Sequence, residues 1–187
     1  MKLLVVLTAL CFGLAFSEEL KNDAAVSPLS VGATPAEWTV ADWFNSPALT
    51  LAELRGKVVL VRFWTSPECP FCSATAPALN EFNAAYKEKG LQVIGFYTHK
   101  KPAPIEAGEA KKYADLYGFT FPNAVDPGSK TLKHWWLAGD RKKFTSVSFL
   151  LDRKGVVQFI HPGGQYVKGD ADYAALKAKI ESLLEQK

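Results

Sequence analysis

Residues 57–72 read KVVLVRFWTSPECPFC, an apolar, β-branched run that leads directly into two cysteines separated by two residues. The run is long enough for a strand that is buried on both faces of a sheet. Pro70 suits the first turn of a helix, and apolar residues then recur at helical spacing until Gly90 ends the pattern. The sequence therefore predicts a buried strand followed by a helix, with Cys69 and Cys72 at the start of that helix.

The alternation of strand and helix continues along the rest of the chain. LQVIGFYT at 91–98 is a second buried-strand run, and a helical pattern follows at 105–117. SVSFLLD and VVQFIHPGG are typical of a hairpin with a turn at 153–155. The remaining expected elements are a short hairpin after Trp38, one helical turn at 49–57, a short strand at 119–126, a weak helix at 129–139 and a helix from Asp170. This order predicts an α/β domain with a mostly parallel sheet and helices on both faces.

The composition and net charge of the chain indicate a single domain and argue against some classes of binding partner. The chain has 187 residues, 48% of them hydrophobic, which suits one domain with a sizeable core. Its 22 Lys and Arg against 19 Asp and Glu give a net charge of +3. Because this charge is small and evenly spread, we expect neither a nucleic-acid partner nor attraction to an anionic membrane surface.

The first 17 residues, MKLLVVLTALCFGLAFS, are typical of a secretory signal peptide cleaved after Ser17. Their apolar run, 3–16, is shorter than the roughly 20 residues that a membrane span needs, so we expect no stable span after cleavage. Lipidation at Cys11 or an uncleaved N-terminal anchor is the alternative.

Export defines the expected organisation of the chain. Residues 1–17 form the signal peptide, residues 18–35 a flexible leader rich in Ala, Ser and Pro, and residues 36–187 the folded domain. Export would place the domain in the periplasm or another extracytoplasmic compartment, which is oxidising and in which cysteines are usually paired.

The cysteine pair has a chemical purpose at the start of a helix. The unpaired amide donors and the partial positive charge of a helix N-terminus stabilise a thiolate and lower its pKa. A second thiol three residues on is close enough to attack a mixed disulfide on the first, so the pair carries two electrons and resets itself. We therefore assign Cys69 as the attacking thiol and Cys72 as the resolving thiol, with their disulfide as the redox group and no other cofactor.

Three other uses of the pair compete with this one. A structural disulfide that closes so small a loop adds little stability. A zinc site needs about four ligands, and the sequence has no second C-x-x-C or H-x-x-H cluster. A copper site would use Cys69, Cys72 and one histidine. His99 follows the second strand at the edge where the cysteines should lie, so it is the histidine that we would place at the site, whereas His161 suits a structural or surface role.

The core segment GKVVLVRFWTSPECPFCSATAPALNEFNAAYKEKGLQVIGF resembles that of thioredoxin-like proteins of the TlpA/ResA type, which are exported thiol-disulfide oxidoreductases. FTFPNAVD and SFLLDRKGVVQFIHPGG match the later strand and hairpin of this family, so the resemblance covers roughly residues 38–185. It implies a thioredoxin fold with a central mixed sheet flanked by helices and an N-terminal hairpin extension. Pro77 matches the helix-kinking proline of the family.

The sequence departs from the family pattern at three places near the cysteines. Ser146 stands where these proteins carry a cis-proline that faces the cysteines, and a residue other than proline strongly prefers a trans peptide bond. Arg62 stands where thioredoxins carry a buried acid that assists proton transfer, which an arginine cannot do. Arg62 would lower the pKa of a thiol if it lay close to one, or it would simply point outward at the strand edge, and of the two we favour the outward position. Thr75 stands where ResA-like members carry an active-site glutamate.

The rim of the site is also unusual. One residue more than usual separates Trp64 from Cys69, and Glu68 would disfavour the Cys69 thiolate if its charge lay near. The dipeptide between the cysteines carries no titrating group, so we expect a less stabilised thiolate than in strongly oxidising relatives. The rim residues that we predict are Trp64, Pro67, Glu68, Pro70, Phe71, Thr145, Ser146 and Val147.

The first functional hypothesis is an exported oxidoreductase that exchanges disulfides with protein thiols and depends on an upstream redox donor. The second is a peroxiredoxin-like thiol peroxidase, because Ser66 lies three residues before Cys69, as in the Thr/Ser-x-x-Cys motif that positions peroxide. The third is a thioredoxin-fold module without enzymatic activity that binds copper or a partner protein.

Overall fold

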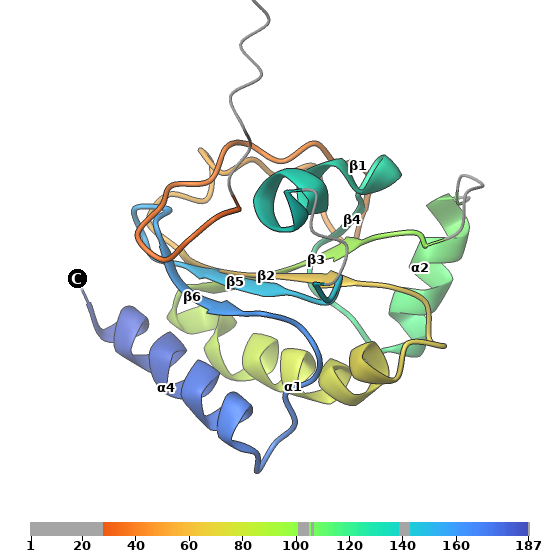
Figure 1. Cartoon of the computed structure of the whole chain (residues 1–187). Coiled ribbons are helices and arrows are strands. Elements are labelled where there is room, and N and C mark those ends of the chain that lie inside the picture. Colours follow the sequence, from red (N-terminus) through yellow and green to blue (C-terminus); the bar gives the residue numbers. More distant parts are fainter. Residues whose placement is uncertain (1–27, 101–104, 106, 139–142, 187) are drawn as a thin grey trace, which may run out of the picture.

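The computed structural model describes residues 28–100, 105, 107–138 and 143–186, and within them the chain forms one six-stranded sheet with helices on both faces (Figure 1). The order of the strands is β1-β4-β3-β2-β5-β6. The strands are β1 (Ala41–Phe44), β2 (Val58–Trp64), β3 (Leu91–Tyr97), β4 (Asn123–Val125), β5 (Ser148–Leu151) and β6 (Val157–His161). Strands β2, β3 and β4 are parallel, whereas β1–β4, β2–β5 and β5–β6 are antiparallel. The sheet is therefore mixed. The alternation of strands and helices in the sequence predicted a mostly parallel sheet, whereas three of the five strand pairs are antiparallel.

The helices begin and end where local chemistry favours it. Pro70 occupies the first turn of α1. A 3₁₀ turn follows α1, and Gly90, with φ at 101°, ends that turn in the left-handed conformation. The Asp170 carboxylate accepts a hydrogen bond from the Tyr173 backbone N–H at 2.7 Å and so caps α4. The helices are α1 (Pro70–Tyr86), a 3₁₀ turn (Lys87–Lys89), α2 (Ala107–Leu116), a 3₁₀ turn (Pro127–Ser129), α3 (Lys130–Leu132) continued by a π-helical turn (Lys133–Leu137), and α4 (Ala171–Glu185). The expected helical turn at 49–57 is a series of turns rather than a helix.

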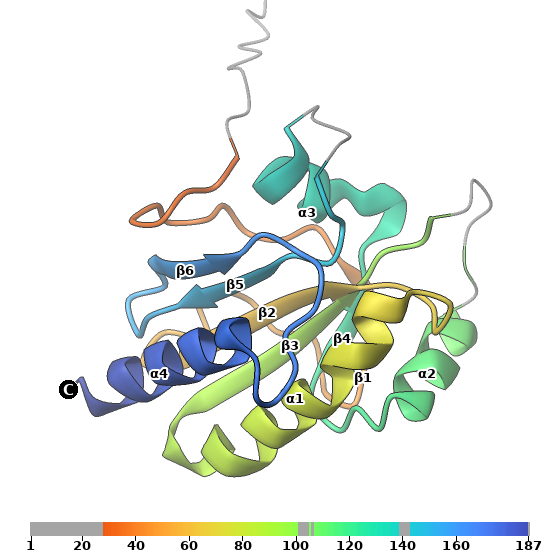
Figure 2. The same cartoon turned by 60° about the horizontal axis from the view of Figure 1, so that its bottom comes forward.

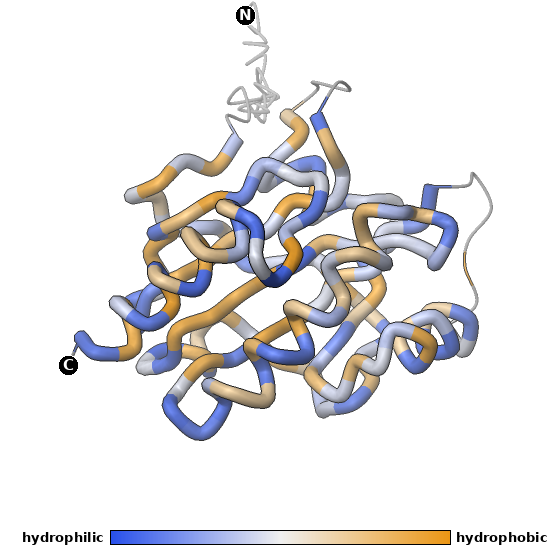
Figure 3. The backbone as a smooth tube through the Cα atoms, turned by 90° about the horizontal axis from the view of Figure 1, so that it is seen from below, coloured by the Kyte–Doolittle hydropathy of each residue, from blue (hydrophilic) through white to orange (hydrophobic). Residues whose placement is uncertain are grey.

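Two hydrophobic cores lie on the two faces of the sheet, because successive residues of β2 point to opposite sides. Val58, Leu60 and Trp64 join the core beneath α1, α2 and α4 (Figure 1). Val59, Val61 and Phe63 join the core beneath the segment α3, which covers the other face (Figure 2). In Figure 3 a hydrophobic trace runs through the middle of the domain, while hydrophilic segments gather at the turns around it. Among the described residues no helix is both long and apolar enough to cross a membrane.

The N-terminal part of the domain differs from the expectation. Instead of a hairpin, the single strand β1 pairs with β4 at the edge of the sheet. Residues 28–35, expected to belong to a flexible leader, pack on the domain: the Leu29 N–H donates to the Trp135 carbonyl at 2.7 Å, and the Gly32 N–H to the Val157 carbonyl at 2.8 Å. Backbone hydrogen bonds to distant elements thus extend the folded domain toward the N-terminus. Most of the expected leader and the whole expected signal peptide lie outside the described residues.

Candidate active site

The two cysteines lie at the start of α1, just after β2, at the carboxyl edge of the parallel strands. Cys69 is the N-cap residue of α1, and Cys72 is in its first turn. The Cys69 side chain is half-buried, whereas Cys72 is only 3% exposed. Both are free thiols, and the Cys72 Sγ–H donates to the Cys69 Sγ at 2.9 Å. An external reagent therefore meets Cys69 first, with Cys72 directly behind it.

The environment drives the pKa values of the two thiols apart. Burial opposes ionisation of Cys69, but hydrogen bonds from the Cys72 side chain and backbone N–H, a hydrogen bond from Thr65 and the charge of Lys100 together lower the pKa of the Cys69 thiol. Burial raises the pKa of Cys72 to about 11, and the hydrogen bond with Cys69 adds to the shift. Cys69, the more accessible of the two sulfurs, therefore ionises more readily than Cys72, and the thiolate is the form that attacks disulfides.

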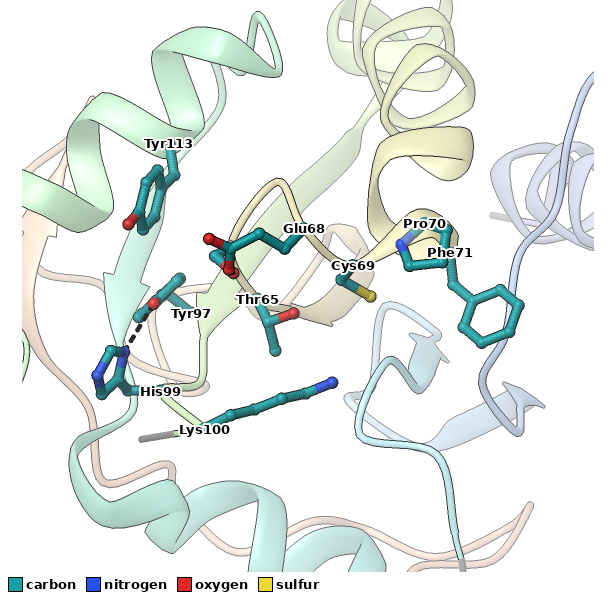
Figure 4. Close-up of a pocket in the computed structure, with 10 residues that line it drawn as sticks. Thr65, Glu68, Cys69, Pro70, Phe71, Tyr97, His99, Lys100 and Tyr113 are labelled. Carbon is teal, nitrogen blue, oxygen red and sulfur yellow. Dashed lines mark hydrogen bonds between the residues drawn. The ribbon is translucent and has the colours of Figure 1, made fainter. Parts of the chain in front are cut away.

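A cleft of about 250 Å³ opens beside Cys69 (Figure 4). Pro70 and Phe71 border it on the side of α1. The carboxyl end of β3 and α2 supply the opposite side, where Tyr97, His99 and Tyr113 lie. The residues that line the cleft are Thr65, Ser66, Glu68, Cys69, Pro70, Phe71, Tyr97, His99, Lys100 and Tyr113. The cleft can therefore hold the part of a substrate that adjoins the reacting disulfide.

The carboxylate of Glu68 is turned away from Cys69. Figure 4 shows it directed toward Tyr97 and Tyr113, and the Ser66 hydroxyl donates to its Oε2 at 2.6 Å. Glu68 is accordingly not among the largest influences on the pKa of the Cys69 thiol. The same hydrogen bond engages Ser66, the residue that a peroxide-binding motif would aim at Cys69.

The segment before β5 lacks the backbone feature of the family. Every described peptide bond is trans, including the bond before Ser146. Ser146 is 3% exposed, and its hydroxyl accepts a hydrogen bond from the Gly164 N–H at 3.1 Å. Val147 is fully buried and its carbonyl accepts from the Phe63 N–H at 3.0 Å, while Thr145 is half-buried. The Ser146 hydroxyl therefore links this segment to the loop after β6, at the position where the family carries a cis-proline.

Arg62 and Trp64 are buried contrary to expectation, as are the predicted rim residues Ser146 and Val147, which do not line the cleft. Arg62 is fully buried instead of pointing outward, because it shares the face of β2 that α1 covers. Trp64, expected at the rim, is also fully buried, and its Nε1–H donates to the Asn123 Oδ1 at 3.0 Å. Trp64 is therefore not one of the residues that line the cleft. Pro67 is half-buried beside the cleft, and its carbonyl accepts from the Ser73 hydroxyl at 3.0 Å.

Four lining residues were missed by the sequence analysis. Thr65 follows β2 directly, and its hydroxyl lies 3.7 Å from the Cys72 Sγ. Tyr97 and Lys100 lie at the end of β3, beside the carboxyl end of β2, so the argument that placed His99 there applied to them as well. Tyr113 on α2 carried no such signal, since only the packing of α2 against the sheet edge brings it to the cleft.

The histidines divide as expected. His99 lines the cleft, and its Nδ1 lies 2.9 Å from the Tyr97 hydroxyl. His161 is 4% exposed on β6, away from the cleft, and pairs with Asp172 at 3.4 Å. Within the described ranges no group of three or more His, Cys, Asp or Glu side chains is placed to hold a metal ion.

Lys100 offers a test of how the Cys69 thiolate is stabilised. Figure 4 shows its ammonium group extended toward Cys69, and its charge lowers the pKa of that thiol. Lys100→Met should raise the pKa, so that a smaller fraction of Cys69 is thiolate at neutral pH. We expect iodoacetamide to alkylate the reduced variant about two- to fivefold more slowly, the range for an exposed charge interaction. The two rates should converge as pH rises above both pKa values.

The control is Lys57→Met, because Lys57 is exposed at the opposite end of β2. It should leave the alkylation rate unchanged. Equal rates for wild type and Lys100→Met across the pH range would show that Lys100 does not act on Cys69.

Comparison with known proteins agrees with this arrangement. A family model described as Redoxin matches residues 45–176. Protein DipZ of Mycobacterium tuberculosis is 30% identical over 166 residues, which cover 87% of this chain and 22% of DipZ. Peroxiredoxin Q of Triticum aestivum is 30% identical over 137 residues, covering 71% of this chain and 59% of that protein. The chain therefore spans only about a fifth of one relative and about three fifths of the other.

A third relative and a solved structure match the chain over most of their own length. Thiol-disulfide oxidoreductase ResA of Bacillus thuringiensis is 28% identical, covering 69% of this chain and 68% of ResA. The crystal structure of a DsbE-type thiol:disulfide interchange protein from Chlorobium tepidum is 29% identical with a TM-score of 0.67, covering 83% of this chain and 99% of that chain. The expected thioredoxin-like fold and the likeness to ResA are thereby confirmed.

Proposed function

The chain belongs to the redoxin family, and from this premise we propose that it is a thiol-disulfide oxidoreductase that exchanges disulfides with protein thiols through its CPFC dithiol. The observation that carries the proposal is the asymmetry of the two sulfur atoms. Cys69 is half-buried at a cleft with a lowered pKa, whereas Cys72 is buried behind it with a raised pKa. One thiol is ready to attack, and the other is protected until a mixed disulfide forms.

The reaction proceeds in two exchange steps. The Cys69 thiolate attacks one sulfur of a substrate disulfide, a Cys69–substrate disulfide forms, and the other substrate sulfur leaves as a thiolate. Cys72 then attacks Cys69 and releases the second substrate thiolate. The dithiol loses two electrons to the substrate, so an upstream thiol donor must reduce the Cys69–Cys72 disulfide again. No other cofactor enters this scheme.

Substrates and location follow from the same proposal. The name of the ResA relative, a thiol-disulfide oxidoreductase, supports protein thiols or disulfides as substrates. We propose export to an extracytoplasmic compartment on the pattern of residues 1–17, with an uncleaved anchor as the alternative. These residues lie outside the described part of the chain. Nucleic acid has no place in the proposal, because the charge of the chain is small.

The test measures reduction of insulin disulfides by dithiothreitol, with and without the full chain, followed by the turbidity of the released insulin B chain. We expect a clear acceleration that is lost after the reduced protein has been alkylated at Cys69. A thiol-trapping titration in glutathione buffers should show one reversible two-electron transition. Absence of both the acceleration and the transition would refute the proposal.

A thiol peroxidase is the second candidate, and the similarity to peroxiredoxin Q is the observation that favours it. The hydrogen bond from Ser66 to Glu68 weighs against it, because the Ser66 hydroxyl is directed at a carboxylate and not at a peroxide beside Cys69. Hydrogen peroxide consumption by the reduced chain, measured in the same preparation, separates the two. Peroxide turnover without insulin reduction would establish the peroxidase instead.

A further inference from the structure

Arg62 is a buried cation directly beneath the helix that carries the cysteines. Its side chain is fully buried on the α1 face of β2. The guanidinium Nη2–H donates to the Gly164 carbonyl at 2.8 Å, and the Nη1–H donates to the Ser148 hydroxyl at 3.3 Å. The Tyr166 ring lies 5.3 Å from the guanidinium carbon. All of these partners are neutral.

The surroundings of Arg62 hold no fixed counter-charge in the part of the chain that the structure describes. None of the ion pairs formed there includes Arg62, and its Nε has no hydrogen-bond partner. Burying a charge without an opposite charge is unfavourable, because the charge loses its hydration. Such a residue is stabilised whenever a neighbouring group becomes anionic.

In the described part of the chain the charge of Arg62 acts on Cys72, Tyr117, His161 and Tyr166, and of these Cys72 is the group that becomes an anion during the proposed reaction. Burial raises the pKa of Tyr117 to about 12, so its hydroxyl stays neutral. Tyr166 is buried, which raises the pKa of its hydroxyl, and burial lowers the pKa of His161, so both stay neutral near neutral pH. Cys72 lies on the same buried side of α1 as Thr75, whose Oγ1 accepts from the Arg62 Nη2–H at 3.5 Å. Burial raises the pKa of Cys72 to about 11, and the charge of Arg62 acts against that rise.

We propose that Arg62 is a positioning residue for the second exchange step, in which its buried guanidinium stabilises the Cys72 thiolate. This inference rests on the proposed function. In the step, Cys72 loses its proton and its sulfur forms a bond with the Cys69 sulfur. The bond between Cys69 and the substrate sulfur breaks, and the substrate leaves with the electron pair and takes up a proton. Arg62 itself exchanges no proton, because its guanidinium stays charged.

The experiment resolves the two steps with the reduced full chain and dithiobis-nitrobenzoate under single-turnover conditions. The first thionitrobenzoate released reports the attack of Cys69, and the second reports the attack of Cys72 on the mixed disulfide. For Arg62→Met we expect the first phase within about threefold of wild type and the second phase at least tenfold slower at neutral pH. Tenfold corresponds to a rise of one unit in the pKa of Cys72.

The pH profile separates an electrostatic role from a structural one. If Arg62 only lowers the pKa of Cys72, the second phase of Arg62→Met should shift to higher pH and approach the wild-type rate there. Arg62→Lys keeps the charge and should restore most of the rate. Ser148→Ala is the matched control, because it removes a partner of Arg62 but keeps the guanidinium. It should leave the second phase unchanged.

The outcomes distinguish the two proposals. If wild type releases only one thionitrobenzoate per chain, Cys72 does not resolve and the proposed function fails. If wild type releases two and Arg62→Met retains the wild-type second phase at every pH, only the role of Arg62 fails. Equal slowing in Arg62→Met and Arg62→Lys would also overturn it, since the charge would then not matter. Should Arg62→Met fail to fold by circular dichroism, Arg62→Gln replaces it under the same criteria.

Discussion

Cys69→Ser is expected to lower the rate of insulin reduction by about a thousandfold or more, to the level of the uncatalysed reaction. The reason is that Cys69 is the accessible sulfur with the lowered pKa, while Cys72 is 3% exposed and its pKa is raised to about 11. The remaining thiol is shielded from the substrate, and its burial opposes ionisation at neutral pH. Activity is read from the insulin assay, and thiol accessibility from alkylation followed by mass spectrometry.

Cys72→Ser is the matched control, because it changes the same chemical group 2.9 Å away. Turnover should again be lost, but Cys69 should still attack and remain joined to the substrate. The variant should therefore accumulate a mixed disulfide that is visible on a non-reducing gel and disappears with dithiothreitol. Accumulation in Cys69→Ser instead would reverse the assignment of the two roles.

Trp135→Ala should cause the largest loss of stability, about 3 to 5 kcal/mol in the free energy of unfolding. Trp135 is fully buried in the π-helical turn after α3 and packs on Phe63 and Phe149. Its Nε1–H donates to the Ala36 carbonyl at 3.1 Å, which ties the N-terminal segment to this core. The alanine variant loses both the aromatic packing and this tie. Urea denaturation followed by circular dichroism measures the effect.

Trp136→Ala provides the comparison at the adjacent position. Trp136 is partly exposed, its Nε1–H donates to the Phe144 carbonyl at 3.0 Å, and the Lys143 ammonium lies 4.5 Å from its ring. Loss of these surface contacts should cost about 1 kcal/mol. Two tryptophans in succession cannot both be fully buried by one helix, and here Trp135 is fully buried, whereas Trp136 only borders the same core beside Phe149. Equal losses in the two variants would contradict this assignment.

Much of the site was predictable because its chemistry is local in the sequence. The apolar run, Pro70 and the helical spacing that follows placed Cys69 and Cys72 at the start of a helix, and the structure has them there. The hydrogen bonds of that helix start and the burial of the second position separate the two thiols in the predicted direction. His99 was also placed at the site correctly, since neighbouring parallel strands end at one edge.

The errors concern contacts between segments that are far apart in the chain. The expected N-terminal hairpin is an edge strand, because β1 finds its partner in β4. Residues 28–35 pack on the domain through backbone hydrogen bonds to Trp135 and Val157. A segment rich in Ala, Ser and Pro without periodicity predicts a flexible leader, and nothing in that composition reveals that distant carbonyl and amide groups will be within reach.

Arg62 is the residue whose position could least be predicted from the sequence. The sequence by itself determined the strand that carries Arg62, the helix that follows, and which cysteine attacks and which resolves. Each of these depends on residues that are close together in the chain. The sequence left Arg62 on the surface, since charged side chains are rarely buried and every other residue of β2 is apolar, so that no alternation marks a face. Only the tertiary structure buries it, because Ser148 and Gly164, which are 86 and 102 residues away, supply its hydrogen-bond acceptors.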